Sequence, residues 1–313
     1  MGYFQRYGSI KPGGLIQLDP EHPFTQGLIA CILFNEGMGI PRVLLGPSAT
    51  VVQPNQVMNA SGGFPATWIS SQEGFGQRFV TNQTYWMSNG TTGSGSDIWI
   101  PTTAATVCII RRKTDSTNRA VAMIGVNNSA HDNREFTIYC PYSNGSVLFD
   151  FGGTASPNRL TVAGLSFSTV VPERLILHAG PSGSAMWQNG IKVGSQSTAI
   201  TRNGATVSSA FEINGPFSGD NQEFYYLAFY NSQWPDNLCQ WWSASPYENL
   251  YSETFGNKFF FLGALSSDVT GTLTETISLV GLTGVGSYQD NQSNTQIQPP
   301  GNITLPIHQF ERV

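Results

Sequence analysis

Short runs of β-branched and aromatic residues recur along this sequence, separated by Gly, Asn, Ser and Pro. Runs of about four to eight residues with turn residues between them are typical of antiparallel strands in a sandwich or barrel. The pattern therefore predicts an all-β fold. The predicted strands are Ala105–Ile110, Ala120–Ile124, Phe136–Tyr139, Val147–Phe151, Arg174–Ala179, Ala185–Gln188, Phe211–Ile213 and Phe224–Tyr230.

Two Asn-Gly pairs mark predicted hairpins, Asn144-Gly145 and Asn189-Gly190. Both residues of such a pair tolerate the positive φ angles that two-residue turns require. The second pair lies between two extended segments within Ala185–Val193, which predicts a strand–turn–strand unit with Trp187 in the core.

One segment, Trp234–Ser243, has the periodicity of a helix. Leu238, Trp241 and Trp242 are spaced to form one apolar face, and Pro235 suits the first helical position. We expect Trp241 and Trp242 to pack against the β domain. A helix lying on a membrane surface is disfavoured because this segment contains no Lys or Arg.

The charge content argues against two classes of partner. Only 11% of the residues are charged, and the net charge is −5 with 15 Lys and Arg, so the clustered cations of a nucleic-acid binder are missing. The longest apolar runs, such as Leu175–Leu177, are too short to cross a bilayer, and residues 1–7 lack the order of a secretory signal. We expect neither a nucleic-acid nor a membrane partner.

Four cysteines are spread along the chain: Cys31, Cys108, Cys140 and Cys239. They form no Cys-x-x-Cys pair and no zinc-type spacing. At least two lie in apolar runs, which favours buried free thiols over the alternative of two disulfides.

Five phrases, in order, resemble a known family. They are His22-Pro23 with Gly27-Leu28-Ile29 and Leu33–Gly37, then Gly74–Phe79, Thr106–Arg111, Met186–Gly190, and Phe224–Tyr230 with Trp234–Tyr247. Together they are similar to the concanavalin A-like, laminin-G-like jelly-roll domains of tailed bacteriophages and prophages. The resemblance covers roughly His22 to Phe261 and implies a jelly-roll β-sandwich with one short C-terminal helix.

The chain ends differ from this central domain in composition. We expect an N-terminal arm over residues 1–20, the jelly-roll domain over 21–262, and a β-rich C-terminal extension over 263–313. An extension so polar cannot bury much surface alone, so we expect it to contact other copies. The residues expected to pair strands between subunits are Thr270, Thr272, Thr274, Ile277 and Leu279.

Catalytic carboxylates are not evident. Glucanases of this architecture carry Glu-x-Asp-x-x-Glu on one strand, and the sequence contains no such motif. Glu135, Asp150, Glu212 and Glu223 are scattered, and Asp132 with Glu135 is expected in a solvated turn. We therefore predict that the protein is not an enzyme.

The sequence contains no Gly-x-Ser-x-Gly motif, the nucleophile elbow with which a catalytic histidine would act. Its four histidines are His22, His131, His178 and His308. His178 lies in an apolar strand and is expected to be a hydrogen-bonded core residue. His22 belongs to the opening phrase and is expected to fix a turn.

Ligand sites are harder to assign. Tyr85, Trp86 and Trp99 lie in a polar, Gly- and Thr-rich region and are candidate platforms for a glycan, although burial of these large side chains is the favoured alternative. Asp290–Asn294 comes nearest to a calcium loop, so a structural calcium ion stays open. We assign no metal ligand and no cofactor.

These features together favour a structural role on the surface of a phage particle. The expected function is a capsid decoration or cement protein that locks neighbouring subunits. Its partners would be copies of itself, with a trimer expected, and the major capsid or other virion proteins. The alternative is a tail fibre or adhesin that binds host surface glycan through the lectin-like domain.

Overall fold

The computed structural model describes fifteen stretches of the chain. They are residues 9–12, 16–35, 37, 41, 43–46, 58–61, 66–80, 84–87, 103–119, 123–126, 136–201, 211–214, 221–252, 276–277 and 303–304. The chain divides into two compact units, Met1–Glu253 and Thr254–Val313. The predicted domain boundaries remain a prediction.

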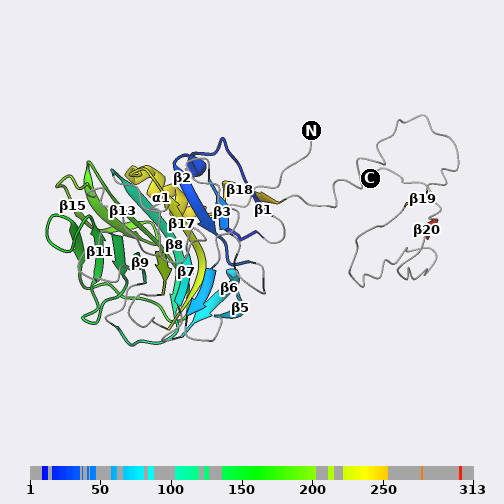
Figure 1. Cartoon of the computed structure of the whole chain (residues 1–313), viewed down its shortest axis with the longest axis horizontal. Helices are drawn as coiled ribbons and strands as arrows, with labels where there is room; N and C mark the ends of the chain where they lie inside the picture. The colour runs from blue at the N-terminus through cyan, green and yellow to red at the C-terminus, as the bar shows by residue number, and fades with distance from the viewer. Residues whose placement is uncertain are drawn as a thin grey trace. The chain divides into compact units, whose positions relative to one another are not determined.

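Two antiparallel sheets form the first unit (Figure 1). One has the order β12-β11-β10-β9-β16-β7-β4, with strands at Arg159–Val162, Val147–Phe151, Phe136–Tyr139, Ile124–Val126, Phe211–Ile213, Thr84–Met87 and Met58–Ser61. The other has the order β15-β14-β13-β8-β17-β2-β3, with strands at Ile191–Gln196, Gly183–Gln188, Glu173–Gly180, Ala105–Lys113, Gln222–Tyr230, Leu28–Ile32 and Val43–Leu45. In this second sheet β6 (Gly74–Phe79) also pairs with β17, and β5 (Thr67–Ser71) pairs with β6.

Smaller elements complete the described structure. Strand β1 (Ile16–Leu18), from the predicted N-terminal arm, pairs with β18 (Leu250–Ser252). The helical elements are a 3-10 turn, η1 (Pro23–Thr25), and one α-helix, α1 (Asp236–Ala244). In the second unit, β19 (Thr276–Ile277) pairs with β20 (Ile303–Thr304).

The sheet that contains β13 and β8 is covered on both faces. Side chains alternate along β13, so that Leu175 and Leu177 enter the core between the two sheets. Ile176, between them, enters a second core on the outer face, together with Trp187 and Trp242. This outer core lies under α1, η1 and the β1–β18 pair. Burial on both faces explains the continuous apolar runs Val107–Ile110 in β8 and Leu175–Leu177 in β13.

The predicted all-β sandwich with one short α-helix is therefore confirmed. Strands β10, β11 and β16 have the predicted bounds, and the other predicted strands are extended or shifted at their ends. The segment predicted at Ala120–Ile124 differs most, since β9 begins only at Ile124 and residues 120–122 lie outside the described residues.

The helix differs from the prediction in detail. Pro235 occupies the N-cap position in an extended conformation rather than the first helical turn. Trp242 is fully buried, as expected, but the side chain of Trp241 is 39% exposed. Its ring covers Phe24 at a centroid distance of 4.8 Å, and its Nε1 donates to Glu248 at 2.6 Å. Trp241 thus packs at the rim, because a helix on a flat sheet buries a narrow stripe.

The two Asn-Gly turns have different geometries. At β14–β15, Asn189 and Gly190 have φ angles of 52° and 83°, which confirms the predicted two-residue turn. At β10–β11 only Gly145 has a positive φ, and its N–H donates to the Tyr142 carbonyl. Ser146 N–H donates to the Asn144 side chain at 3.0 Å, so a longer loop replaces the two-residue turn expected there.

Two further predictions concern single residues. His22 caps η1, with Nδ1 accepting from the Phe24 N–H at 3.2 Å, so the expected turn-fixing role is confirmed. All four cysteines are buried free thiols, also as predicted. Burial raises the pKa of Cys31 to about 12, which keeps this thiol protonated and unreactive at neutral pH.

Gly183 provides a test of the β13–β14 turn. Its φ is +94°, and a Cβ there would lie 1.9 Å from the Gln196 carbonyl oxygen. We expect Gly183→Ala to lower the free energy of unfolding by more than about 3 kcal/mol. Gly164→Ala is the control, because its φ is +75° with no atom within 4 Å of the added Cβ; it should cost only about 1 kcal/mol. Equal losses in urea unfolding would show that the contact with Gln196 is unimportant.

Candidate functional site

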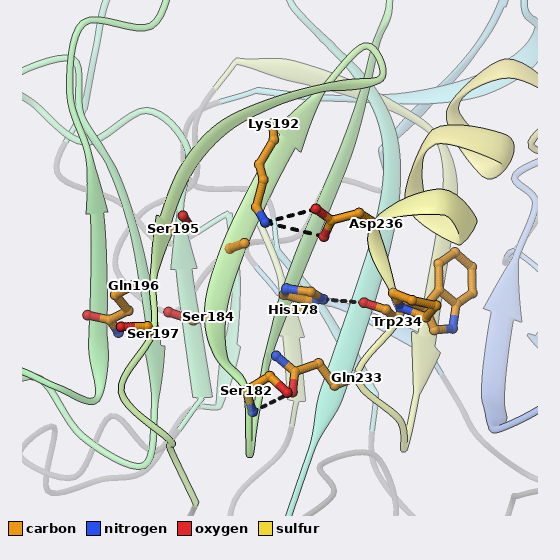
Figure 2. A pocket seen from close by; sticks show the side chains of 12 residues that line it. His178, Ser182, Ser184, Lys192, Ser195, Gln196, Ser197, Gln233, Trp234 and Asp236 are labelled. Atoms are coloured by element: carbon orange, nitrogen blue, oxygen red, sulfur yellow. Dashed lines mark hydrogen bonds and ion pairs between the residues drawn. The ribbon is translucent and has the colours of Figure 1, made fainter.

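A pocket of about 360 Å³ lies on the first unit, where the edge of the larger sheet meets the segment that precedes α1 (Figure 2). Strands β13, β14 and β15 form one side. Gln233, Trp234, Pro235 and Asp236 form the other. The volume is within the range of small-molecule sites, roughly 300–1,000 Å³.

Hydrogen bonds join the two sides of this pocket. The Ser182 N–H donates to Gln233 Oε1 at 3.0 Å, and Gln233 Nε2 donates to the Gly183 carbonyl at 2.9 Å. The Gln233 amide is thus fixed at both ends. Because these bonds link the β13–β14 turn to the segment before α1, the pocket is formed before any ligand enters.

His178 lies at the floor of the pocket and is 6% exposed. Its Nδ1 lies 2.8 Å from the Trp234 carbonyl oxygen, and its ring meets Trp187 edge-on at 4.6 Å. The expected hydrogen-bonded core histidine is confirmed. A carbonyl oxygen only accepts, so the neutral ring carries its proton on Nδ1 and leaves Nε2 as an acceptor. Burial lowers the pKa of His178 to about 4.

One ion pair crosses the rim. Lys192 Nζ lies 3.1 and 3.2 Å from the two carboxylate oxygens of Asp236 (Figure 2). Both side chains are partly exposed, so the pair contributes little stability. Lys192 also lies 5.1 Å from the centre of the buried Trp187 ring. The two charges cancel, and the pocket carries no net charge from its rim.

Serine hydroxyls supply most of the remaining polar surface. Ser182, Ser195 and Ser197 are exposed at the rim, whereas Ser184 is buried at 2% exposure. The Ser184 hydroxyl has no hydrogen-bond partner within the described part of the chain. Ser184 pairs with Ala179, whose side chain belongs to the core between the sheets, so the Ser184 hydroxyl points into the sandwich and not towards His178.

The pocket is poorly equipped for catalysis. Its only carboxylate is Asp236, which is occupied by Lys192, and its histidine stays neutral and anchored. Asp150 and Glu223, the scattered acids that the structure describes in full, lie in other parts of the fold. Asp150 pairs with Arg159, and Glu223 pairs with two arginines.

A buried charge lies inside the sandwich. Arg111 is fully buried, with Nη2 3.3 Å from Cys140 Sγ and 3.8 Å from a Glu173 carboxylate oxygen. The guanidinium also lies 4.8 Å from the Phe167 ring centre. Burial raises the pKa of Glu173. A pair of this kind is costly to desolvate. Arg111 and Glu173 are opposite each other on β8 and β13 of one sheet, and the contact with Cys140 reaches the other sheet.

The residues predicted as sites fall mostly beyond these features. Tyr85 and Trp86 belong to β7, but their side chains are outside the described part, as is the whole of Trp99. The described structure therefore does not bring them together. The acids at 132 and 135, the side chain of Glu212, and the calcium-like loop at 290–294 also lie outside it.

Most of the residues proposed for pairing between subunits are also outside the described part of the chain. Thr270, Thr272, Thr274 and Leu279 lie outside the described residues. Ile277 belongs to β19 and pairs with Ile303 of its own chain. Pairing between subunits stays a prediction.

The pocket residues were not anticipated from the sequence as a group. Lys192 and Asp236 are 44 residues apart, and His178 and Trp234 are 56 apart. The Trp-Pro-Asp phrase before the helix is the one local signal that could have marked this place.

Within the described residues no cluster of three or more His, Cys, Asp or Glu side chains is arranged to hold a metal ion. The same stretches contain no helix with the length and apolar character needed to span a membrane.

No family model and no curated protein matches this chain. Solved structures with a similar fold include Trypanosoma rangeli sialidase, 10% identical with a TM-score of 0.47, over 73% of this chain and 35% of the sialidase. The binding domain of Paraclostridial Mosquitocidal Protein 1 is 11% identical with a TM-score of 0.47, over 70% of this chain and 52% of that domain.

A third is domain 4 of AbnA, a GH43 extracellular arabinanase from Geobacillus stearothermophilus. It is 10% identical with a TM-score of 0.41, over 68% of this chain and 96% of that domain. The chain spans about a third of the sialidase's length. These likenesses concern the fold, and no functional residue is transferred from them.

Because His178 is buried, we expect the free energy of unfolding to depend on pH. The unfolded imidazole takes up a proton near pH 6.5, whereas the folded one does so only near pH 4. Between these values the unfolded state binds more protons, so the free energy of unfolding falls as the pH is lowered from 7 to 4, by up to about 3 kcal/mol. Urea unfolding of His178→Gln should show a shallower fall, and an identical pH profile would contradict this origin.

Proposed function

We propose that this chain is a non-enzymatic virion protein of a tailed phage, in the role of a capsid decoration or cement protein. The sandwich acts as a rigid body on the particle surface, and the chain ends contact neighbouring copies and other virion proteins. The observation that carries the non-catalytic part is the state of the pocket. Its one carboxylate and its one histidine are both held by partners within the fold.

The assignment to a virion has two supports. The first is the ordered set of five sequence phrases that resemble phage jelly-roll domains. The second is the low charge content of 11%, which allows identical surfaces to approach without strong repulsion.

The division of the chain supports a role for its C-terminal part outside the sandwich. Thr254–Val313 forms a unit of its own. The core clusters that the described residues form belong to the first unit. We infer that the second unit binds other subunits, by strand addition in particular.

A second candidate function is an adhesin that binds host carbohydrate. The pocket beside α1 favours it, because hydroxyl and amide side chains line a preformed hollow of suitable size. Tyr85, Trp86 and Trp99 stay the predicted aromatic platform for such a glycan.

Assembly through the C-terminal unit can be tested by substitution in the full chain. We expect Ile277→Asp and Leu279→Asp to shift the oligomer, a trimer in this proposal, towards monomer, because a charge in a paired apolar strand opposes burial. Light scattering after size-exclusion chromatography measures the change.

Ile191→Asp is the matched control, since Ile191 is 69% exposed on the sandwich and should leave the oligomer intact. A wild-type chain that is monomeric, and that fails to bind assembled capsids, would refute the decoration role.

A further inference from the structure

We propose that the pocket between β15 and the segment before α1 binds a neutral saccharide unit. This inference rests on the second candidate function, the binding of carbohydrate, and places it at a site away from Tyr85, Trp86 and Trp99. It requires no contribution from the C-terminal unit.

The ion pair at the rim of the pocket disfavours charged ligands. Lys192 and Asp236 lie within 3.2 Å of each other, so each already has its counter-charge. A charged ligand would have to break this pair or pay for desolvation without a partner. A neutral ligand meets no such penalty.

The hydrogen-bonding groups match sugar hydroxyls. A sugar hydroxyl both donates and accepts, and the serine hydroxyls of the pocket do the same. Ser182, Ser195 and Ser197 at the rim have no hydroxyl partner within the part of the chain that the structure describes. Figure 2 shows Ser195 and Ser197 on one side of the pocket, facing the side on which Gln233 and Asp236 lie.

One buried group gives the floor its specificity. His178 pairs with Ala185 across β13 and β14, so its side chain lies on the outer face of the sheet, the face that Trp234 covers. Its Nε2 atom accepts, because Nδ1 is bound to the Trp234 carbonyl (Figure 2). A ligand with a hydroxyl at its edge would donate to Nε2.

The size of the pocket limits the ligand to a small saccharide. The side chain beside His178 at the floor, Ala185, is short, and the large rings of Trp187 and Trp234 are buried. A volume of about 360 Å³ accommodates one or two sugar rings. Without an exposed aromatic platform, the affinity comes from hydrogen bonds and is therefore modest.

The test begins with a glycan array and continues with calorimetric titration of the full chain. We expect at least one neutral mono- or disaccharide to bind with a Kd of about 1 mM or tighter. Sialic acid and glucosamine serve as charged comparators and should bind more weakly. A preference for either charged sugar, or no binding of any neutral saccharide, would overturn the inference.

Variants locate the binding. Ser195→Ala should weaken it about 3- to 10-fold, by removing one hydrogen-bonding group at the rim. Ser195→Phe should abolish it by filling the rim. The matched controls are Ser166→Ala and Ser166→Phe, at an exposed serine away from the pocket, and these should leave the Kd within about twofold. Circular dichroism and the urea midpoint establish that each variant is folded.

The results of these binding measurements distinguish a failure of the pocket assignment from a failure of the adhesin function. If saccharide binding is unchanged in both pocket variants but lost in Trp86→Ala, the adhesin function stands and the pocket assignment is wrong. If no glycan binds at all, the pocket assignment and the adhesin function both fail. The assembly role is then still decided by light scattering.

Discussion

The structure depends on one sheet that is buried on both faces. The strands β13, β8 and β17 contribute alternate side chains to the core between the sheets and to the outer core under α1. An open sheet of this width needs such a cover, because an apolar face left in water opposes folding. The cover must be held in place, and the residues that hold it, Gln233 and the Trp234 carbonyl, are those that shape the pocket.

Much of the fold follows from local pattern. Phe136–Tyr139 and Val147–Phe151 were predictable because β-branched and aromatic runs end at Gly and Asn, which mark turns. Trp241 packs on Phe24 as predicted, but its 39% exposure was not predictable, because periodicity defines a helical face and not the width of the surface it covers. The Asn144 turn differs because the Asn side chain competes for a backbone N–H, an interaction that the dipeptide alone does not specify.

The site was less predictable than the fold, for a physical reason. Its parts come from β13, the β14–β15 hairpin and the segment before α1, which only the strand pairing brings together. Serine is common in this chain, so Ser195 and Ser197 do not stand out in the sequence as residues of a pocket. His178 was predictable as a core residue from its apolar neighbours, but the direction of its free nitrogen depends on Trp234.

Stability and binding share the same bonds here, and this limits how the pocket can work. Removing the His178–Trp234 or Ser182–Gln233 bond would loosen the cover over the outer core as well as the pocket wall. Changes to the rim carry no such cost, because the hydroxyls of Ser195 and Ser197 have no hydrogen-bond partner among the described residues. A rigid floor with an adaptable rim gives binding without conformational change, which keeps the entropic cost low.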